Sequence, residues 1–133
     1  MDLTLYNKYN AELSEELDLT DFNLRDVQLK LPGIKHKWVK RLIDQKIETD
    51  KLKKLKIKAI ETIIEENRKT NRVALSDAAL KAQAEKHEVV KKIDDKIDEC
   101  EILIDYLTKV ERVCSSTSFD IKNLMEIRKS EMT

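Results

Sequence analysis

The sequence predicts an all-α protein with an elongated helical protomer, a long basic helix and C-terminal oligomerisation helices. The 133 residues include one glycine and one proline, too few for the tight turns of β-sheet proteins or for glycine-rich phosphate loops. Charged residues make up 39% of the chain and aromatic residues 5%, a composition typical of long solvated helices. Apolar residues also recur at helical spacing through most of the sequence.

The first segment is predicted to be a short amphipathic helix followed by a linker. Leu3, Tyr6, Leu13 and Leu17 fall on one helical stripe, so we expect this helix to end near residue 18. Residues 18–26 are rich in Asp, Thr and Asn and predict the linker.

An extended segment is predicted next, because Val27, Leu29 and Leu31 alternate with polar residues. Pro32 strengthens this expectation, since a proline disfavours helical backbone in the residue before it. The longest helix is then predicted to begin at Ile34.

The predicted long helix spans residues 34–69 without a glycine or proline. At 1.5 Å per residue it would be about 54 Å long. A compact chain of this size has a diameter of roughly 36 Å, so such a helix must protrude or be shared between chains. We therefore expect a homo-oligomer rather than a compact monomer.

The C-terminal part is predicted to contain three more helices. Asn71 interrupts the long helix, Ser76 and Asp77 offer N-cap chemistry, and residues 78–84 are rich in alanine. The polar run 115–118 is expected to break the next helix, with Ser118 capping a short last one. We accordingly divide the chain into an N-terminal helical region, 1–75, and a C-terminal helical region, 76–133. The charge pattern and the apolar stripe described next are the basis for expecting DNA binding in the first region and oligomerisation in the second.

A heptad-like apolar stripe marks the predicted oligomerisation surface. Its alternative is packing within the chain, against the long basic helix. The residues assigned to the surface are Val90, Ile93, Ile97, Ile104 and Leu107.

Charge is distributed unevenly, although the formal net charge is zero. Residues 1–29 carry net −5, whereas residues 30–58 hold eleven basic and three acidic side chains, net +8. A basic helix face can follow a phosphate backbone, and the alternative is a lysine face that only keeps the helix solvated. Trp38 could stack on a base, but its position favours the core. The DNA-binding candidates are Lys37, Lys40, Arg41, Lys51, Lys54 and Lys58.

No catalytic, metal or cofactor site is predicted. His36 and His87 lie in different predicted helices without Cys or acidic residues at metal-ligand spacing. Cys100 and Cys114 would lie about 21 Å apart along one helix, too far for a disulfide, and fall on the apolar stripe as buried thiols. With no membrane-spanning run, we expect a soluble protein of a reducing cytoplasm that is not an enzyme.

Several stretches together resemble the UvsY family of bacteriophage recombination mediators over roughly residues 17–130. The order and spacing of these stretches carry the resemblance, rather than any single motif. They are Leu29-Lys30-Leu31-Pro32, Ile34-Lys35-His36-Lys37-Trp38, Leu55-Lys56-Ile57-Lys58-Ala59, Asp105-Tyr106-Leu107, and Phe119-Asp120-Ile121-Lys122-Asn123 followed by Arg128.

The resemblance implies a role in phage DNA recombination, repair and replication, in the cytoplasm of the infected bacterial host. It implies binding to single-stranded DNA and a ring of about six or seven subunits. The implied protein partners are a RecA-like phage recombinase and the phage single-stranded-DNA-binding protein that the recombinase replaces. Lys58 matches a DNA-contacting lysine, while Ile60 stands where the family usually has a basic residue. The chain also has Thr62-Ile63-Ile64-Glu65 where the family commonly has Tyr-Tyr-Ser-Gly, so binding is expected to depend more on lysine electrostatics than on aromatic stacking.

Overall fold

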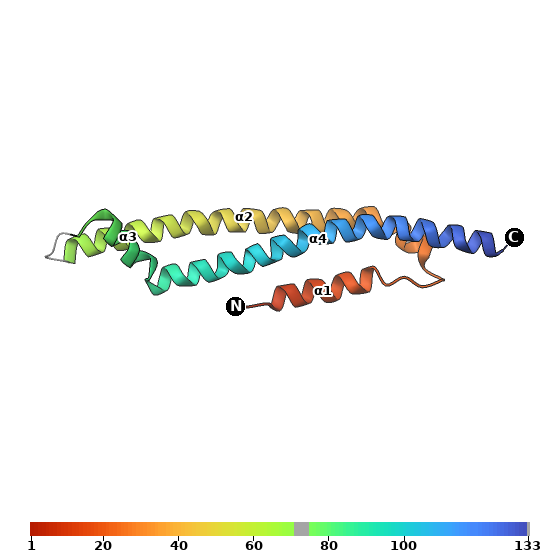
Figure 1. Cartoon of the computed structure of the whole chain (residues 1–133), viewed down its shortest axis with the longest axis horizontal. Helices are drawn as coiled ribbons and strands as arrows, with labels where there is room; N and C mark the ends of the chain where they lie inside the picture. The colour runs from red at the N-terminus through yellow and green to blue at the C-terminus, as the bar shows by residue number, and fades with distance from the viewer. Residues whose placement is uncertain (71–74, 133) are drawn as a thin grey trace. The chain divides into compact units, whose positions relative to one another are not determined.

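The computed structural model describes residues 1–70 and 75–132, and that part of the chain contains four helices and no strand (Figure 1). This confirms the all-α class. The helices are α1 (Thr4–Glu16), α2 (Leu24–Thr70), α3 (Asp77–Glu85) and α4 (Glu88–Glu131).

The chain forms two compact units, and α2 and α4 each contribute to both. One, which we call the middle unit, contains Gln45–Ile102. The other, which we call the terminal unit, combines Asp2–Asp44 with the chain from Leu103 onward. These units cut the chain differently from the functional regions 1–75 and 76–133, whose assignment stays a prediction.

The middle unit packs α2 against the beginning of α4. Leu52 of α2 is buried with Ile93, Ile97 and Cys100 of α4. These three α4 positions follow 4- and 3-residue spacing, which puts them on one helical stripe facing Leu52. An ion pair between Lys56 and Asp94, 2.8 Å long, also joins the two helices.

The terminal unit has a larger core, to which three helices contribute. Leu13 comes from α1, and Trp38 and Leu42 come from α2. Leu107 and Cys114 add the α4 side of the same cluster. A second cluster joins the start of α2 to α4 through Leu24, Val27 and Ile121.

The extended segment predicted before Pro32 is wrong, because α2 already begins at Leu24 and contains Pro32. Leu29, the middle residue of the supposed alternation, is 71% exposed, whereas Val27 and Leu31 are buried. Leu24, Val27 and Leu31 share one helical face and pack into the core. A proline inside a helix costs about 3 kcal/mol, and this burial offsets that cost.

The helix break predicted at residues 115–118 is also wrong, since α4 continues through them to Glu131. The Thr117 hydroxyl donates to the Val113 carbonyl oxygen at 2.8 Å, a bond that is compatible with the helix. Cys114, Thr117 and Ile121 are all buried at 3- and 4-residue spacing, so the buried stripe is unbroken. Ser118 therefore lies inside α4 and caps no separate helix.

The capping expectation for α3 is confirmed: the Ser76 hydroxyl accepts a hydrogen bond from the Ala79 amide at 3.2 Å. The predicted interruption at Asn71 lies outside the described residues, although α2 ends just before it, at Thr70. None of the helices formed by residues 1–70 and 75–132 carries an apolar stretch sufficient to span a bilayer.

Candidate nucleic-acid interface

The six basic candidates divide evenly between the two units. Lys51, Lys54 and Lys58 belong to the middle unit, and the other three belong to the terminal unit. The surroundings of the two groups differ.

The middle-unit group forms an exposed face, which we call the open lysine face: Lys51, Lys54 and Lys58. Its 3- and 4-residue spacing puts all three side chains on one side of α2, opposite the buried Leu52. Lys54 pairs with Asp50 of its own helix at 2.9 Å, and both side chains are mostly solvated. Neither Lys51 nor Lys58 has an ion-pair partner among the residues described. This group can therefore meet an external polyanion without losing an interhelical contact.

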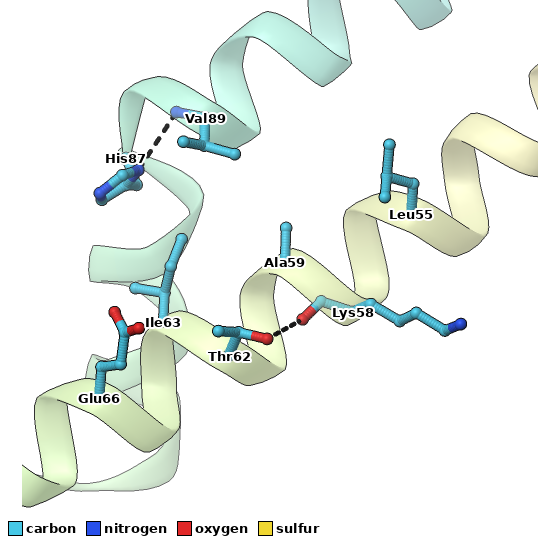
Figure 2. A pocket seen from close by; sticks show the side chains of 8 residues that line it. All are labelled: Leu55, Lys58, Ala59, Thr62, Ile63, Glu66, His87 and Val89. Atoms are coloured by element: carbon cyan, nitrogen blue, oxygen red, sulfur yellow. Dashed lines mark hydrogen bonds between the residues drawn. The ribbon is translucent and has the colours of Figure 1, made fainter.

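A shallow hollow of about 360 Å³ lies beside Lys58 in the same unit (Figure 2). Its walls are mainly apolar, from Leu55 and Ile63 of α2 and Val89 of α4. His87 stands at the edge, where its Nδ1 accepts the Val89 amide hydrogen at 3.1 Å. Figure 2 shows the Lys58 ammonium pointing away from His87 and Val89, and this residue is exposed.

The terminal-unit group meets the acidic helix α1. Lys37 Nζ lies 2.9 Å from a Glu12 carboxylate oxygen and 2.6 Å from a Glu16 carboxylate oxygen. Arg41 donates two hydrogen bonds to Glu12, at 2.7 and 3.2 Å. Both cations are thus neutralised within the chain, whereas Lys40 is solvated and pairs only with Asp44 of α2.

Aromatic rings complete this terminal site. The Arg41 guanidinium lies 4.6 Å from the Tyr9 ring centroid and 4.7 Å from the Trp38 ring centroid. Trp38 is 2% exposed, and its indole N–H donates to Glu16 at 3.1 Å. The expectation that Trp38 packs in the core is confirmed, and its ring is not available to a base in this structure.

The ion pairs shift the pKa values of their members. Hydrogen bonds from Arg41 first, then from Lys37, lower the pKa of Glu12 from 4.5 to about 2. Burial opposes the charged form of Lys37, but its bonds to Glu16 and Glu12 raise its pKa overall. The bond to Glu12 raises the pKa of Arg41. All three groups stay charged at neutral pH.

Sequence reasoning missed the residues of α1 that complete this site: Tyr9, Glu12 and Glu16. A signal was present, because these residues are spaced by three and four positions and so share one helical face beside Leu13. An acidic stripe flanking an apolar one indicates a helix that docks on a basic surface. The net charge of −5 over residues 1–29 predicts that this segment attracts a basic surface, but it does not predict which one.

The predicted oligomerisation residues are largely covered within their own units. Val90, Ile93 and Ile97 are buried in the middle unit, and Leu107 is buried in the terminal unit. Ile104 is half-buried against the terminal core. This packing favours the intramolecular alternative for the stripe, and the oligomerisation role of these residues stays a prediction.

The two cysteines are free and buried, one in each unit. Burial raises the pKa of both thiols, which keeps them protonated and poorly nucleophilic. Across residues 1–70 and 75–132, no cluster of three or more His, Cys, Asp or Glu side chains could hold a metal ion.

Comparison with known proteins gave matches at the level of structure. No family model matches the chain, and no curated protein matches it significantly. Three crystal forms of the bacteriophage T4 recombination mediator protein UvsY do match. The lattice type IV structure has a TM-score of 0.80 at 21% identity, covering 98% of this chain and 99% of that one.

The other two crystal forms agree. The type II structure has a TM-score of 0.78 at 17% identity, covering 100% of this chain and 99% of that one. The type I structure has a TM-score of 0.75 at 18% identity, covering 92% and 97%. The chain therefore has the fold of the T4 recombination mediator UvsY over nearly its whole length.

Proposed function

We propose that this protein is a phage recombination mediator that binds single-stranded DNA without catalysing a reaction. It promotes loading of a RecA-like recombinase onto strands coated by the phage single-stranded-DNA-binding protein, in the infected cell's cytoplasm, during recombination, repair and replication. The observation that carries the proposal is the structural match to UvsY at a TM-score of 0.80 over 98% of the chain. That similarity is one of fold, and this chain's own basic residues support the DNA contact.

The open lysine face is the primary DNA contact in this proposal. Lys51, Lys54 and Lys58 are solvated, so pairing them with phosphates disrupts no core contact. Each phosphate contact releases counterions, and for single strands it contributes about −0.7 to the log-log slope of affinity against salt. Three contacts therefore give a slope near −2 for each protomer.

Several protomers acting together supply the avidity that three weak contacts lack. We propose a homo-oligomer, and we place its contact in the terminal unit on the exposed α4 side chains Val113, Leu124 and Ile127. Their spacings of eleven and three residues put them on one helical face. Unlike the buried heptad stripe, they can pack against a second chain while the internal core stays intact.

Mediation follows physically from repeated weak sites. One protomer can release the strand locally while the others hold it, which gives a recombinase room to bind. Such an assembly also bends or wraps the strand, and this loosens the protein that coats it.

Salt-dependent binding to an oligodeoxythymidine tests the DNA contact. The triple substitution Lys51→Gln, Lys54→Gln, Lys58→Gln is expected to flatten the log-log slope by about 2. The matched control removes the same charge from exposed α4 positions, namely Lys109, Lys122 and Lys129. Equal slopes in both triple variants contradict the assigned face. Absence of DNA binding by the unmodified protein at low salt instead favours a structural coiled-coil adaptor with a solvated lysine face.

Reconstituted strand exchange tests the mediator role. The unmodified protein is expected to stimulate its recombinase more on DNA coated by the single-stranded-DNA-binding protein than on bare DNA. Equal stimulation on coated and bare DNA contradicts mediation, even if DNA binding itself is confirmed.

A further inference from the structure

Helix α1 covers two of the cations that a DNA-binding protein of this fold would otherwise present. Glu12 and Glu16 both form ion pairs with Lys37 Nζ, which also lies 5.4 Å from the Trp38 ring centroid. Glu12 receives both hydrogen bonds from Arg41. The same helix places Tyr9 against the Trp38 ring, with centroids 5.4 Å apart. All of these contacts lie within the terminal unit.

The carboxylates of α1 occupy the positions that phosphate oxygens would take. Arg41 meets Glu12 with two parallel N–H donors, the geometry by which a guanidinium also binds phosphate. Lys37 bridges two carboxylates about one helical turn apart, as a lysine can bridge charges along a nucleic-acid backbone. The covered surface therefore has the chemistry of a polyanion site that is already filled.

The attachment of α1 is limited in extent. Leu13 is the one buried residue of its thirteen. Tyr9 and Leu17 are half-buried against the same cluster, and Tyr6 meets Tyr106 of α4 edge to face with ring centroids 5.1 Å apart. A short non-helical link, seen in Figure 1, connects α1 to α2. Displacement of α1 would thus uncover one buried and several half-buried apolar side chains of α1. The ion pairs that it breaks can be replaced by contacts to a phosphate backbone.

We propose that α1 is a displaceable acidic cover, and that phosphates of single-stranded DNA compete with Glu12 and Glu16 for Lys37 and Arg41. Displacement opens a second DNA subsite in the terminal unit, where Trp38 becomes available for stacking on a base. This inference rests on the proposed DNA binding by the open lysine face, which holds the strand first. In the protein without bound DNA, α1 keeps the second subsite closed.

The decisive variant replaces both carboxylates, Glu12→Gln with Glu16→Gln, and so keeps side-chain size while removing the competing charge. The two phosphate contacts no longer require displacement of α1, so the log-log salt slope for binding to an oligodeoxythymidine is expected to be steeper by up to about 1.4, the full difference applying where α1 still covers the subsite in the unmodified complex. Affinity at low salt should rise accordingly. Adding Lys37→Gln and Arg41→Gln to this variant should abolish the gain.

The matched control is Glu15→Gln with Asp18→Asn, which changes the net charge equally in the same acidic segment. Both side chains are exposed, and neither makes an ion pair with a described residue. If the loss of two negative charges raises DNA affinity only through long-range electrostatics, the control and the Glu12, Glu16 variant will gain affinity equally. That result overturns the proposal.

Trp38 provides a second measurement that needs no substitution, because it is the chain's one tryptophan and lies beneath α1. Saturating DNA is expected to change its emission and its access to acrylamide in the unmodified protein. If saturating DNA changes neither the emission of Trp38 nor its quenching by acrylamide, the proposal that α1 is displaced is wrong. This result does not depend on whether the α1 variant folds.

The two proposals fail in distinguishable ways. If the unmodified protein binds DNA with the slope expected of the open lysine face, but neither Trp38 nor the α1 variant responds, only the cover is wrong. If no form of the protein binds DNA at low salt, the proposed function itself is wrong.

Discussion

Lys58 and Arg41 lie on the same helix, α2, yet their side chains meet different surroundings. Lys58 belongs to the middle unit and projects into solvent. Arg41 belongs to the terminal unit and is enclosed by Glu12, Tyr9 and Trp38. The periodicity of α2 is common to both, so the element that packs on each side chain decides whether a cation is open to a ligand.

The largest expected effect comes from disrupting the core on which α1 rests. Leu107 is 1% exposed and shares a cluster with Leu13 and Trp38. Leu107→Asp places an unpaired charge there and should lower the free energy of unfolding by about 4 kcal/mol or more. Urea denaturation followed by circular dichroism measures this loss. Trp38 should also become solvated.

Val113→Asp is the control, because Val113 is an exposed residue of the same helix. It should leave stability within about 0.5 kcal/mol of the unmodified chain. In sedimentation it should separate subunits without unfolding them, if the proposed contact face is right. A stable, folded Leu107→Asp monomer would instead place Leu107 between subunits, as the heptad pattern predicted.

As the pH falls, α1 is expected to detach from the terminal unit before the middle unit unfolds. Because the pKa of Glu12 is about 2 in the folded chain against an ordinary value of 4.5, its ion pairs stabilise fully above about pH 4.5. Their contribution, on the order of 1–2 kcal/mol after allowance for partial solvation, disappears as the pH falls toward 2. Trp38 emission between pH 5 and 2 reports the change.

Glu12→Gln should remove most of this pH dependence, because it removes the titrating group. Glu15→Gln, on the exposed side of α1, should retain it. A Trp38 transition of the same size in both variants would show that other carboxyl groups hold α1 in place.

Much of the fold could be predicted from the sequence because helices depend on local pattern. The scarcity of glycine and proline and the apolar periodicity predict the class, and Ser76 marks the start of α3. The boundaries at Pro32 and at residues 115–118 could not be predicted locally. There, burial of Leu31 and Thr117 by distant segments outweighs the local preference of proline and of hydroxyl side chains.

The candidate site was predictable to a similar degree. Lys51, Lys54 and Lys58 follow from helix geometry alone, since exposure on one face requires only the period of α2. The pairing of Lys37 with Glu12 and Glu16 could not be predicted in this way. It depends on where α1 docks, across more than twenty positions of sequence.

A smaller effect is expected from the interhelical pair of the middle unit. Lys56 and Asp94 are both partly solvated at 2.8 Å, so Lys56→Gln should lower the free energy of unfolding by about 0.5–1 kcal/mol. The hydrogen bond to Asp94 raises the pKa of Lys56. Lys56 should therefore stay protonated, and the ion pair intact, to a higher pH than a solvated lysine would stay protonated. Urea denaturation measures the loss. Lys53→Gln, on an exposed position, is the control and should change little.

The smallest change in stability is expected for Lys40. This lysine tests whether a cation's exposure or the unit that contains it decides its contact with DNA. Lys40 belongs to the terminal unit with Arg41, but it is 70% exposed and pairs only with Asp44 of its own helix. Lys40→Gln should therefore change stability by no more than about 0.5 kcal/mol. If exposure decides which cations meet DNA, this substitution should flatten the salt slope by about 0.7, the same change that is expected for Lys54→Gln in the middle unit.

Lys37→Gln is the informative counterpart, since Lys37 lies three residues from Lys40 but is paired with Glu12 and Glu16. In a chain whose α1 stays docked, its loss should leave the slope unchanged. In the Glu12→Gln, Glu16→Gln background, the same substitution should flatten the slope by about 0.7, because the lysine is then free to bind phosphate. If Lys40→Gln instead leaves the salt slope unchanged, the whole terminal unit lies away from the strand. The DNA path would then be confined to the open lysine face.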